Sequence, residues 1–199
     1  MKNYCFLFIL FFVFNIAFSQ ETKDLENEKL PVFLGFRTGA NASNLSYSDL
    51  DYRIGGYFGV FLNFKTSHLY RLQLEIGYSS QGGTSTAKNT NGLQVDYFTI
   101  SAVNKFYLKN SGFHFLVYPS IELDVDGSTF GDDKKNGVTD IDIALGAGFG
   151  YAFNNNLIIE TRFKHGLLDT DIQLFNNNDT DMYNIVFQLG VSYKFKIKD

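Results

Sequence analysis

The sequence contains a single cysteine, Cys5, which lies close to the N-terminus. No disulfide can therefore form within the chain, and a disulfide framework is excluded as its source of stability. The sequence also lacks clusters of basic residues: 17 Lys and Arg stand against 21 Asp and Glu, and the formal net charge is −4. This charge distribution argues against a nucleic acid partner. Glycine-rich nucleotide loops, CxxC pairs and HExxH motifs are absent from the sequence, so it predicts no cofactor and no metal ligand set.

The N-terminal stretch has the layout of a secretory signal peptide. Lys2 supplies a positive charge, residues 6–18 are apolar apart from one asparagine, and a small-x-small sequence ends at Ser19. An apolar run of this length is too short for a membrane-spanning helix, which needs about 20 residues. We therefore predict a signal peptide over residues 1–19, with cleavage between Ser19 and Gln20.

Polar residues dominate the next segment, 20–30, which we interpret as a short flexible leader. From Pro31 onward the sequence shows no helical periodicity, but it has eight segments in which apolar residues alternate with other residues. A period of two is typical of β-strands. The segments are 32–41, 57–64, 72–79, 95–108, 113–124, 141–153, 157–167 and 185–195. Most are longer than the usual strand of about 5–6 residues and closer to the roughly 9–11 residues of a tilted membrane strand.

The two faces of these strands differ sharply in chemistry. One face is apolar and rich in aromatic side chains, such as Phe36, Ile143 and Phe187, and its register contains no charged residue in any of the eight segments. The opposite face combines many glycines with charged residues. The charged residues that we predict to form a paired structural network there are Arg37, Glu75, Lys105, Glu122, Glu160 and Arg162.

This contrast distinguishes between two architectures. A soluble sandwich or lipocalin-like barrel would bury the apolar face, whose bulky side chains would have to fit a limited volume. The interior of an eight-stranded barrel instead suits glycines and paired charges, while lipid sets no such limit on an outward apolar face. We therefore predict an all-β fold over residues 31–199: an eight-stranded antiparallel up-and-down transmembrane β-barrel. Two residues fit this scheme poorly, because Asn104 falls in the lipid-facing register and Pro119 predicts a local bulge.

The connectors between the predicted strands alternate in length. The short ones are 65–71, 109–112 and 154–156, and the long ones are 42–56, 80–94, 125–140 and 168–184. Outer-membrane barrels have short periplasmic turns and long extracellular loops. We therefore expect an outer-membrane location with both termini periplasmic, outer-membrane lipid and the barrel-assembly machinery as partners, and a possible protein partner at the four long loops.

Three stretches resemble the PorT-like outer-membrane β-barrel domain, among the small eight-stranded barrels of the OmpA and OmpX type. "LGFRTGANASNL" is similar to the opening strand, with Gly35, Arg37, Gly39 and Asn41 in a Gly-x-[Lys/Arg]-x-Gly-x-Asn pattern. "ETRFKHGLLDT" resembles the seventh strand, and "LGVSYKF" resembles the closing strand. The chain departs from the family in lacking a proline near Ser101 and in extending four residues beyond Phe195. The resemblance implies an outer-membrane location and little about activity.

Other candidate sites are weaker. The acidic, glycine-containing stretch 124–137 invites a calcium interpretation, but its glycine spacing departs from the EF-hand loop, and a solvated turn-rich loop is the preferred interpretation. The histidines beyond the N-terminal stretch are His68, His114 and His165, and none has the neighbours of a catalytic triad. We therefore expect no enzymatic activity.

Three hypotheses about function remain. The first is a non-enzymatic barrel with a structural or partner-binding role. The second is a narrow porin for small solutes, and the third is a component of a protein-secretion machinery in the same membrane.

Overall fold

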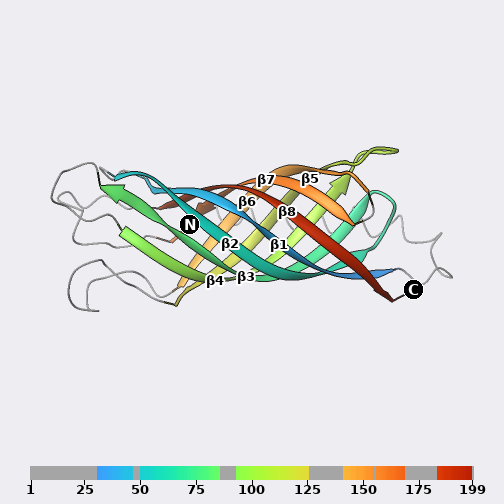
Figure 1. Cartoon of the computed structure of the whole chain (residues 1–199), viewed down its shortest axis with the longest axis horizontal. Helices are drawn as coiled ribbons and strands as arrows, with labels where there is room; N and C mark the ends of the chain where they lie inside the picture. Colours follow the sequence, from blue (N-terminus) through green and yellow to red (C-terminus); the bar gives the residue numbers. More distant parts are fainter. Residues whose placement is uncertain are drawn as a thin grey trace, which may run out of the picture. The chain divides into compact units, whose positions relative to one another are not determined.

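A computed structural model describes residues 31–46, 50–85, 93–125, 141–154, 156–168 and 183–198. The predicted signal peptide and leader lie outside these residues, as does most of the candidate calcium loop 124–137. Eight strands follow one another along the chain, and Figure 1 shows them wrapped around a common axis. They are β1 (Val32–Leu45), β2 (Leu50–Lys65), β3 (Tyr70–Ser85), β4 (Leu93–Tyr107), β5 (Phe113–Asp124), β6 (Ile141–Ala152), β7 (Leu157–Gly166) and β8 (Asn184–Lys198).

Each strand pairs with the next in antiparallel fashion, and β1 pairs with β8, so the sheet closes on itself. Closure leaves no edge strand and satisfies the backbone of the wall internally, as hydrocarbon requires. The prediction of an eight-stranded antiparallel barrel is confirmed. No helix long and apolar enough to cross a bilayer occurs among the described residues.

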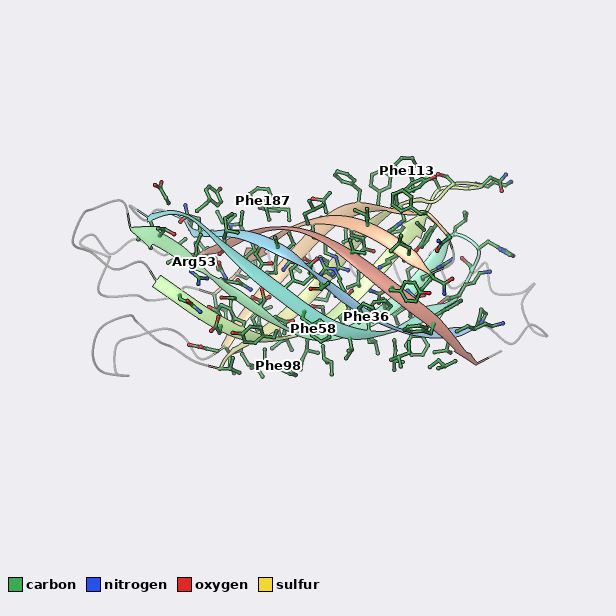
Figure 2. The ribbon with its side chains drawn as sticks, viewed as in Figure 1. Phe36, Arg53, Phe58, Phe98, Phe113 and Phe187 are labelled. Carbon is green, nitrogen blue, oxygen red and sulfur yellow. The ribbon has the colours of Figure 1, made fainter. Side chains whose placement is uncertain are left out.

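The side chains alternate between the two sides of the wall as the sequence predicts. Phe187 is 48% exposed on the outside, whereas its neighbour Gln188 is 7% exposed on the inside. Figure 2 shows Phe98, Phe113 and Phe187 projecting from the edges of the barrel, and Phe36 and Phe58 are likewise exposed. An apolar outer surface over a polar interior is the reverse of a soluble fold, and it suits a lipid environment.

The strands on one side of the barrel run further than the sequence predicts. The prediction of a long loop over residues 42–56 is wrong, because β1 continues to Leu45 and β2 starts at Leu50, with pairing as far as Ser43 and Arg53. Polar residues interrupt the apolar alternation there, but the strands remain paired because backbone hydrogen bonds do not require an apolar face. Ser43 Oγ adds a hydrogen bond to the Gly82 carbonyl at 3.1 Å. Likewise, β3 extends to Ser85 and β4 starts at Leu93, which shortens the predicted loop 80–94.

The predicted bulge at Pro119 is also wrong. Ser101 pairs with Ser120 and Asn104 pairs with Val117, so the β4–β5 register is unchanged across the proline. The two pairs between these positions are absent from the ladder, and the register places Ala102 opposite Pro119. Pro119 therefore interrupts hydrogen bonding without inserting a residue. Register shifts occur instead between Tyr52 and Tyr57 of β2 and at the start of β1.

Inward-facing aromatic rings fill space that glycines leave open. A Cβ added at Gly35 would lie 2.3 Å from Phe61 Cζ, and one added at Gly146 would lie 2.1 Å from Tyr118 Cζ. Such approaches are far below van der Waals contact. The glycine-rich face is thus the partner of interior rings as well as of charges, a pairing that the sequence pattern did not predict. The buried interior aromatic residues are Tyr57, Phe61, Tyr97, Tyr107 and Tyr118.

Candidate functional site: the polar lumen

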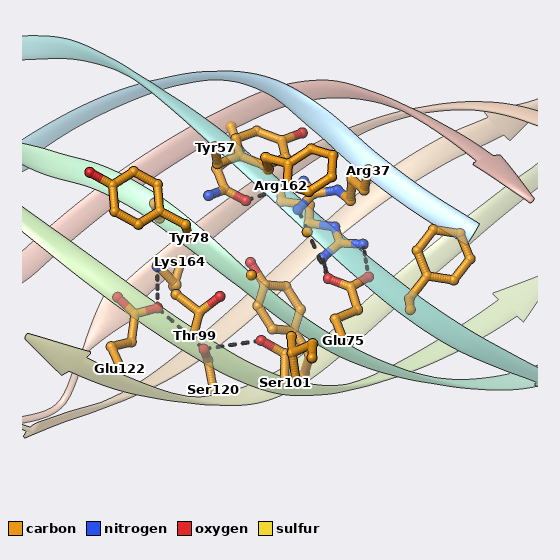
Figure 3. A pocket seen from close by; sticks show the side chains of 18 of the residues that line it. Arg37, Tyr57, Glu75, Tyr78, Thr99, Ser101, Ser120, Glu122, Arg162 and Lys164 are labelled. Atoms are coloured by element: carbon orange, nitrogen blue, oxygen red, sulfur yellow. Dashed lines mark hydrogen bonds and ion pairs between the residues drawn. The ribbon is translucent and has the colours of Figure 1, made fainter. Parts of the chain in front are cut away.

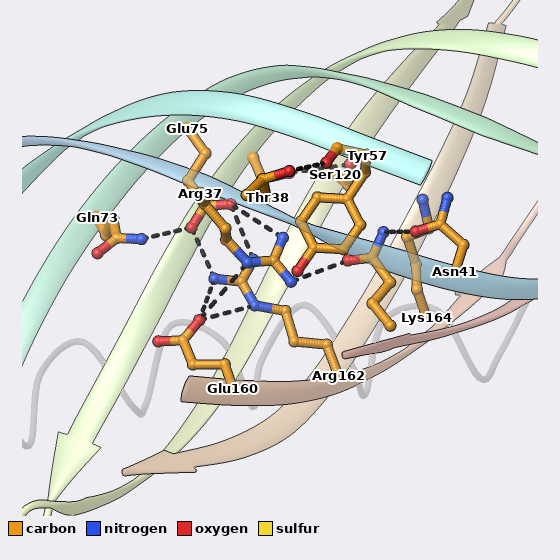
Figure 4. A network of polar contacts seen from close by, with 12 residues as sticks. Arg37, Thr38, Asn41, Tyr57, Gln73, Glu75, Ser120, Glu160, Arg162 and Lys164 are labelled. Atoms are coloured by element: carbon orange, nitrogen blue, oxygen red, sulfur yellow. Dashed lines mark hydrogen bonds and ion pairs between the residues drawn. The ribbon is translucent and has the colours of Figure 1, made fainter. Parts of the chain in front are cut away.

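Arg162 lies at the centre of the charges inside the barrel. It points inward from β7 and meets Glu75 of β3 in a forked pair, with its two terminal nitrogens donating to the carboxylate oxygens at 2.8 and 2.7 Å. The same guanidinium donates to Glu160 Oε2 at 2.6 Å from Nη2 and at 3.1 Å from Nε. Paired guanidinium–carboxylate geometry is the strongest form of such contacts. Figure 4 shows this cluster crossing the interior.

Glu160 gathers further positive charge on its other side. Lys105 of β4 forms an ion pair with Glu160 Oε1, and His114 Nε2 of β5 lies 3.0 Å from the same oxygen. Arg37 Nε of β1 lies 3.8 Å from Glu160 Oε2. Because Glu160 is fully buried, its charge depends on these partners, and a buried carboxylate without them would be strongly unfavourable.

A second ion pair lies nearer the far end of β7, which runs from the short-turn end toward the long-loop end. Lys164 Nζ contacts Glu122 Oε1, and Ser120 Oγ donates to the same oxygen at 3.2 Å. Ser101 and Ser120 are joined across the β4–β5 seam by a hydroxyl contact of 3.1 Å. Gln81 Nε2 donates to the other Glu122 oxygen at 3.1 Å. Figure 3 shows the Lys164–Glu122 and Arg162–Glu75 contacts around one small cavity.

Amide side chains link these charges to β1 and β8. Arg37 Nη2 donates to Gln188 Oε1 at 3.2 Å, and Gln188 Nε2 donates to Asn41 Oδ1 at 3.2 Å. Asn41 Nδ2 in turn lies 2.9 Å from Ser79 Oγ. The polar contacts thus run continuously around the interior wall, and they cross-link strands that are far apart in the sequence.

The cavity between the two ion clusters is small. Its volume is about 30 Å³, room for about two water molecules. Arg37, Glu75, Glu122, Arg162 and Lys164 all contribute to its lining. Two tyrosine hydroxyls in its wall, those of Tyr57 and Tyr118, are buried without a hydrogen-bond partner, so a water molecule there would satisfy them.

All six residues predicted as interior charges point into the lumen. Five of them, Arg37, Glu75, Lys105, Glu160 and Arg162, belong to one connected cluster, whereas Glu122 belongs to the pair with Lys164.

The prediction omitted His114, Lys164 and Gln188 from the network. Their inward register was visible in the sequence, but their partners lie on distant strands. Register alone does not identify such partners.

The remaining histidines lie apart from this cluster. His68 is exposed in the short turn between β2 and β3, and His165 is half-buried with Nδ1 near the Gly166 carbonyl. In the part of the chain that the structure describes, no three His, Cys, Asp or Glu side chains are grouped so as to hold a metal ion.

Comparison with known proteins extends this picture. A family described as outer membrane protein beta-barrel domain matches residues 10–195 of the chain. Neisserial surface protein A has a solved structure with a TM-score of 0.52 and 15% identity, covering 84% of this chain and 100% of that one. Ail of Yersinia pestis, solved in complex with the heparin analogue sucrose octasulfate, has a TM-score of 0.50 and 14% identity, covering 82% and 99%. At such identities the similarity shows the fold alone. Among curated proteins, none matches the chain.

Proposed function

Because the chain belongs to the outer membrane protein beta-barrel domain family and is located in the outer membrane, we propose that it is a non-conducting, non-enzymatic barrel. Its interior serves to stabilise the wall, and its extracellular end is free to contact a partner. The extracellular end is the one opposite the chain termini, since outer-membrane barrels keep their short turns in the periplasm. We also propose that, within this family, the chain is a PorT-like barrel, because its opening, seventh and closing strands resemble those of that group.

The observation that carries the proposal is the blocked cross-section at Arg162. Its side chain reaches from β7 to Glu75 on β3, and Lys105 and His114 close the space beside Glu160 from β4 and β5. The space beside Gly150 is filled by side chains: a Cβ at Gly150 would lie 2.7 Å from both Glu160 Cγ and His114 Cε1. An eight-stranded barrel has an interior just wide enough to be filled by side chains.

Conductance across a planar lipid bilayer tests this proposal. The refolded protein is expected to give no discrete ion-conducting steps. A variant that replaces Glu75, Glu160 and Arg162 with serine removes the side chains that cross the lumen. It is the control in which conductance is expected. Regular steps from the unaltered protein would overturn the proposal and favour the porin alternative. Stoichiometric co-purification with other outer-membrane proteins in mild detergent would instead favour a role within a secretion machinery.

A further inference from the structure

The lumen next to the short-turn end carries positive charge that the ion network does not balance. Lys194 of β8 is 2% exposed on the inner face of the wall, and its Nζ lies 4.5 Å from the centroid of the Phe33 ring. Among the described residues it makes no ion pair. A buried ammonium is strongly unfavourable unless an anion or a set of acceptors accompanies it.

A second cation lies on the opposite part of the wall. Arg71 of β3 is half-buried, and its guanidinium carbon lies 4.4 Å from the centroid of the Tyr107 ring. Its Nε is buried and has no hydrogen-bond partner. Arg71 lies opposite Lys65 in the β2–β3 register and opposite Lys105 in the β3–β4 register, so cations stand side by side on three neighbouring strands at this end.

Glu160 is not free to neutralise this space. It already pairs with Lys105, His114 and Arg162, and Arg37 lies 3.8 Å away. The other lumen carboxylates in ion pairs, Glu75 and Glu122, are bound to Arg162 and Lys164. The charge of Lys194 and Arg71 is therefore left over after the network has formed.

Hydrogen-bond donors without partners accompany the two cations. The Ser192 hydroxyl is fully buried, lies two residues before Lys194 on the same face, and makes no hydrogen bond. The Tyr107 hydroxyl, on the ring that carries the Arg71 contact, is also without a partner. These two cations and two hydroxyl donors face inward at the same end of the barrel, and together they match the needs of an anion that accepts several hydrogen bonds. We call this set, Arg71, Tyr107, Ser192 and Lys194, the periplasmic vestibule.

We propose that the periplasmic vestibule is a binding site for a small oxyanion. The anion enters from the periplasmic rim past Arg71, which is only half-buried, and is held between the Lys194 ammonium and the Arg71 guanidinium. It supplies the negative charge that the lumen network lacks at this end. None of its four residues belongs to the ion pairs of the Arg162 cluster, so the proposal stands whether or not the barrel conducts.

Inorganic phosphate is a suitable probe. Refolded protein in detergent micelles is titrated with phosphate at constant ionic strength, with chloride as the replaced ion, and the backbone amide signals of Ser192, Lys194 and Arg71 are followed by NMR. We expect saturable shifts that fit one site. Lys194→Met should weaken the apparent affinity at least tenfold, and this variant is expected to fold because it removes a buried charge. Lys109→Met, in the exposed turn between β4 and β5, is the matched control and should bind as the unaltered protein does.

A second measurement keeps the test independent of signal assignment. A ligand that binds only the folded state raises the unfolding midpoint in urea. Phosphate should raise the midpoint of the unaltered protein and of Lys109→Met, but not that of Lys194→Met. Shifts that stay linear in phosphate concentration, or equal affinity in the two variants, would overturn the proposal. So would a Lys194 amino group that is neutral both with and without phosphate.

Discussion

The side-chain amide of Asn104 donates a hydrogen bond to the Ala102 carbonyl at 3.2 Å, on the outward face of β4. Ala102 is the residue that the register places opposite Pro119, whose nitrogen has no hydrogen to donate. The Tyr70 hydroxyl completes the arrangement by donating to Asn104 Oδ1 at 2.7 Å. Asn104 therefore supplies the donor that the proline lacks. The polar residue in the lipid-facing register is thus explained by the proline on the neighbouring strand.

This relationship predicts a strong coupling between Asn104 and Pro119. Asn104→Leu should destabilise the folded barrel by about 1–3 kcal/mol, because a carbonyl would be left unsatisfied in an apolar environment. The same change in a Pro119→Ala background should cost less, since the backbone N–H restored by that substitution can donate to the Ala102 carbonyl. The measurement is a double-mutant cycle by urea unfolding in lipid vesicles. The Tyr70 hydroxyl loses its contact with Asn104 in both backgrounds, so that effect cancels. Additive costs would refute the compensation.

The lumen network predicts that removing one carboxylate destabilises the barrel more than removing that carboxylate together with its cation. Glu160→Gln should cost about 3–5 kcal/mol, because Lys105 and Arg162 would remain buried with less negative charge. Combining Glu160→Gln with Lys105→Met should recover part of that loss. Guanidinium unfolding monitored by tyrosine fluorescence provides the comparison. A double variant less stable than Glu160→Gln alone would show that the Lys105–Glu160 pair does not account for the cost.

The interior rings predict which glycines accept a side chain. Gly146→Ala should destabilise the barrel or prevent its assembly, because the new methyl group would overlap the Tyr118 ring. Gly56→Ala is the matched control: the atom nearest to its added Cβ is the Gly39 carbonyl oxygen at 3.9 Å. Heat-modifiable mobility on gels reports the folded fraction of each variant. Replacing Tyr118 by Leu in the Gly146→Ala chain should restore folding, and failure to do so would implicate the backbone rather than the ring.

The architecture was accessible from the sequence because the alternation in this chain is strict. A lipid-facing register without a charged residue fixes which side of every strand faces outward, and residues such as Phe187 and Gln188 lie as that register requires. The strand ends were less accessible. Beyond the hydrocarbon the wall needs no apolar face, so β1 and β2 continue through polar residues that appear in the sequence as a loop.

The contacts inside the lumen required the structure. Arg162 and Glu75 are 87 positions apart, and which carboxylate each cation meets depends on strand tilt and on the space that interior rings occupy. The role of Asn104 likewise required the structure, because it depends on the position of Pro119 on the neighbouring strand. The unbalanced charge of Lys194 and Arg71 becomes apparent only once the ion pairs of the other lumen cations are known.

Site-directed cysteine labelling tests the central claim, that the apolar face meets lipid and the polar face encloses a filled lumen. The chain after Cys5 contains no cysteine, so single cysteines at Phe187 and Gln188 can be compared directly. With a fluorophore attached, the site at Phe187 should be quenched by spin labels carried on lipid acyl chains, whereas a cysteine at Gln188 should show no lipid contact. Phe187→Arg should in addition cost about 2–4 kcal/mol at mid-depth. If the cysteine at Phe187 instead reacts freely with a water-soluble thiol reagent in folded protein and is not quenched by lipid, the assignment of the two faces is contradicted.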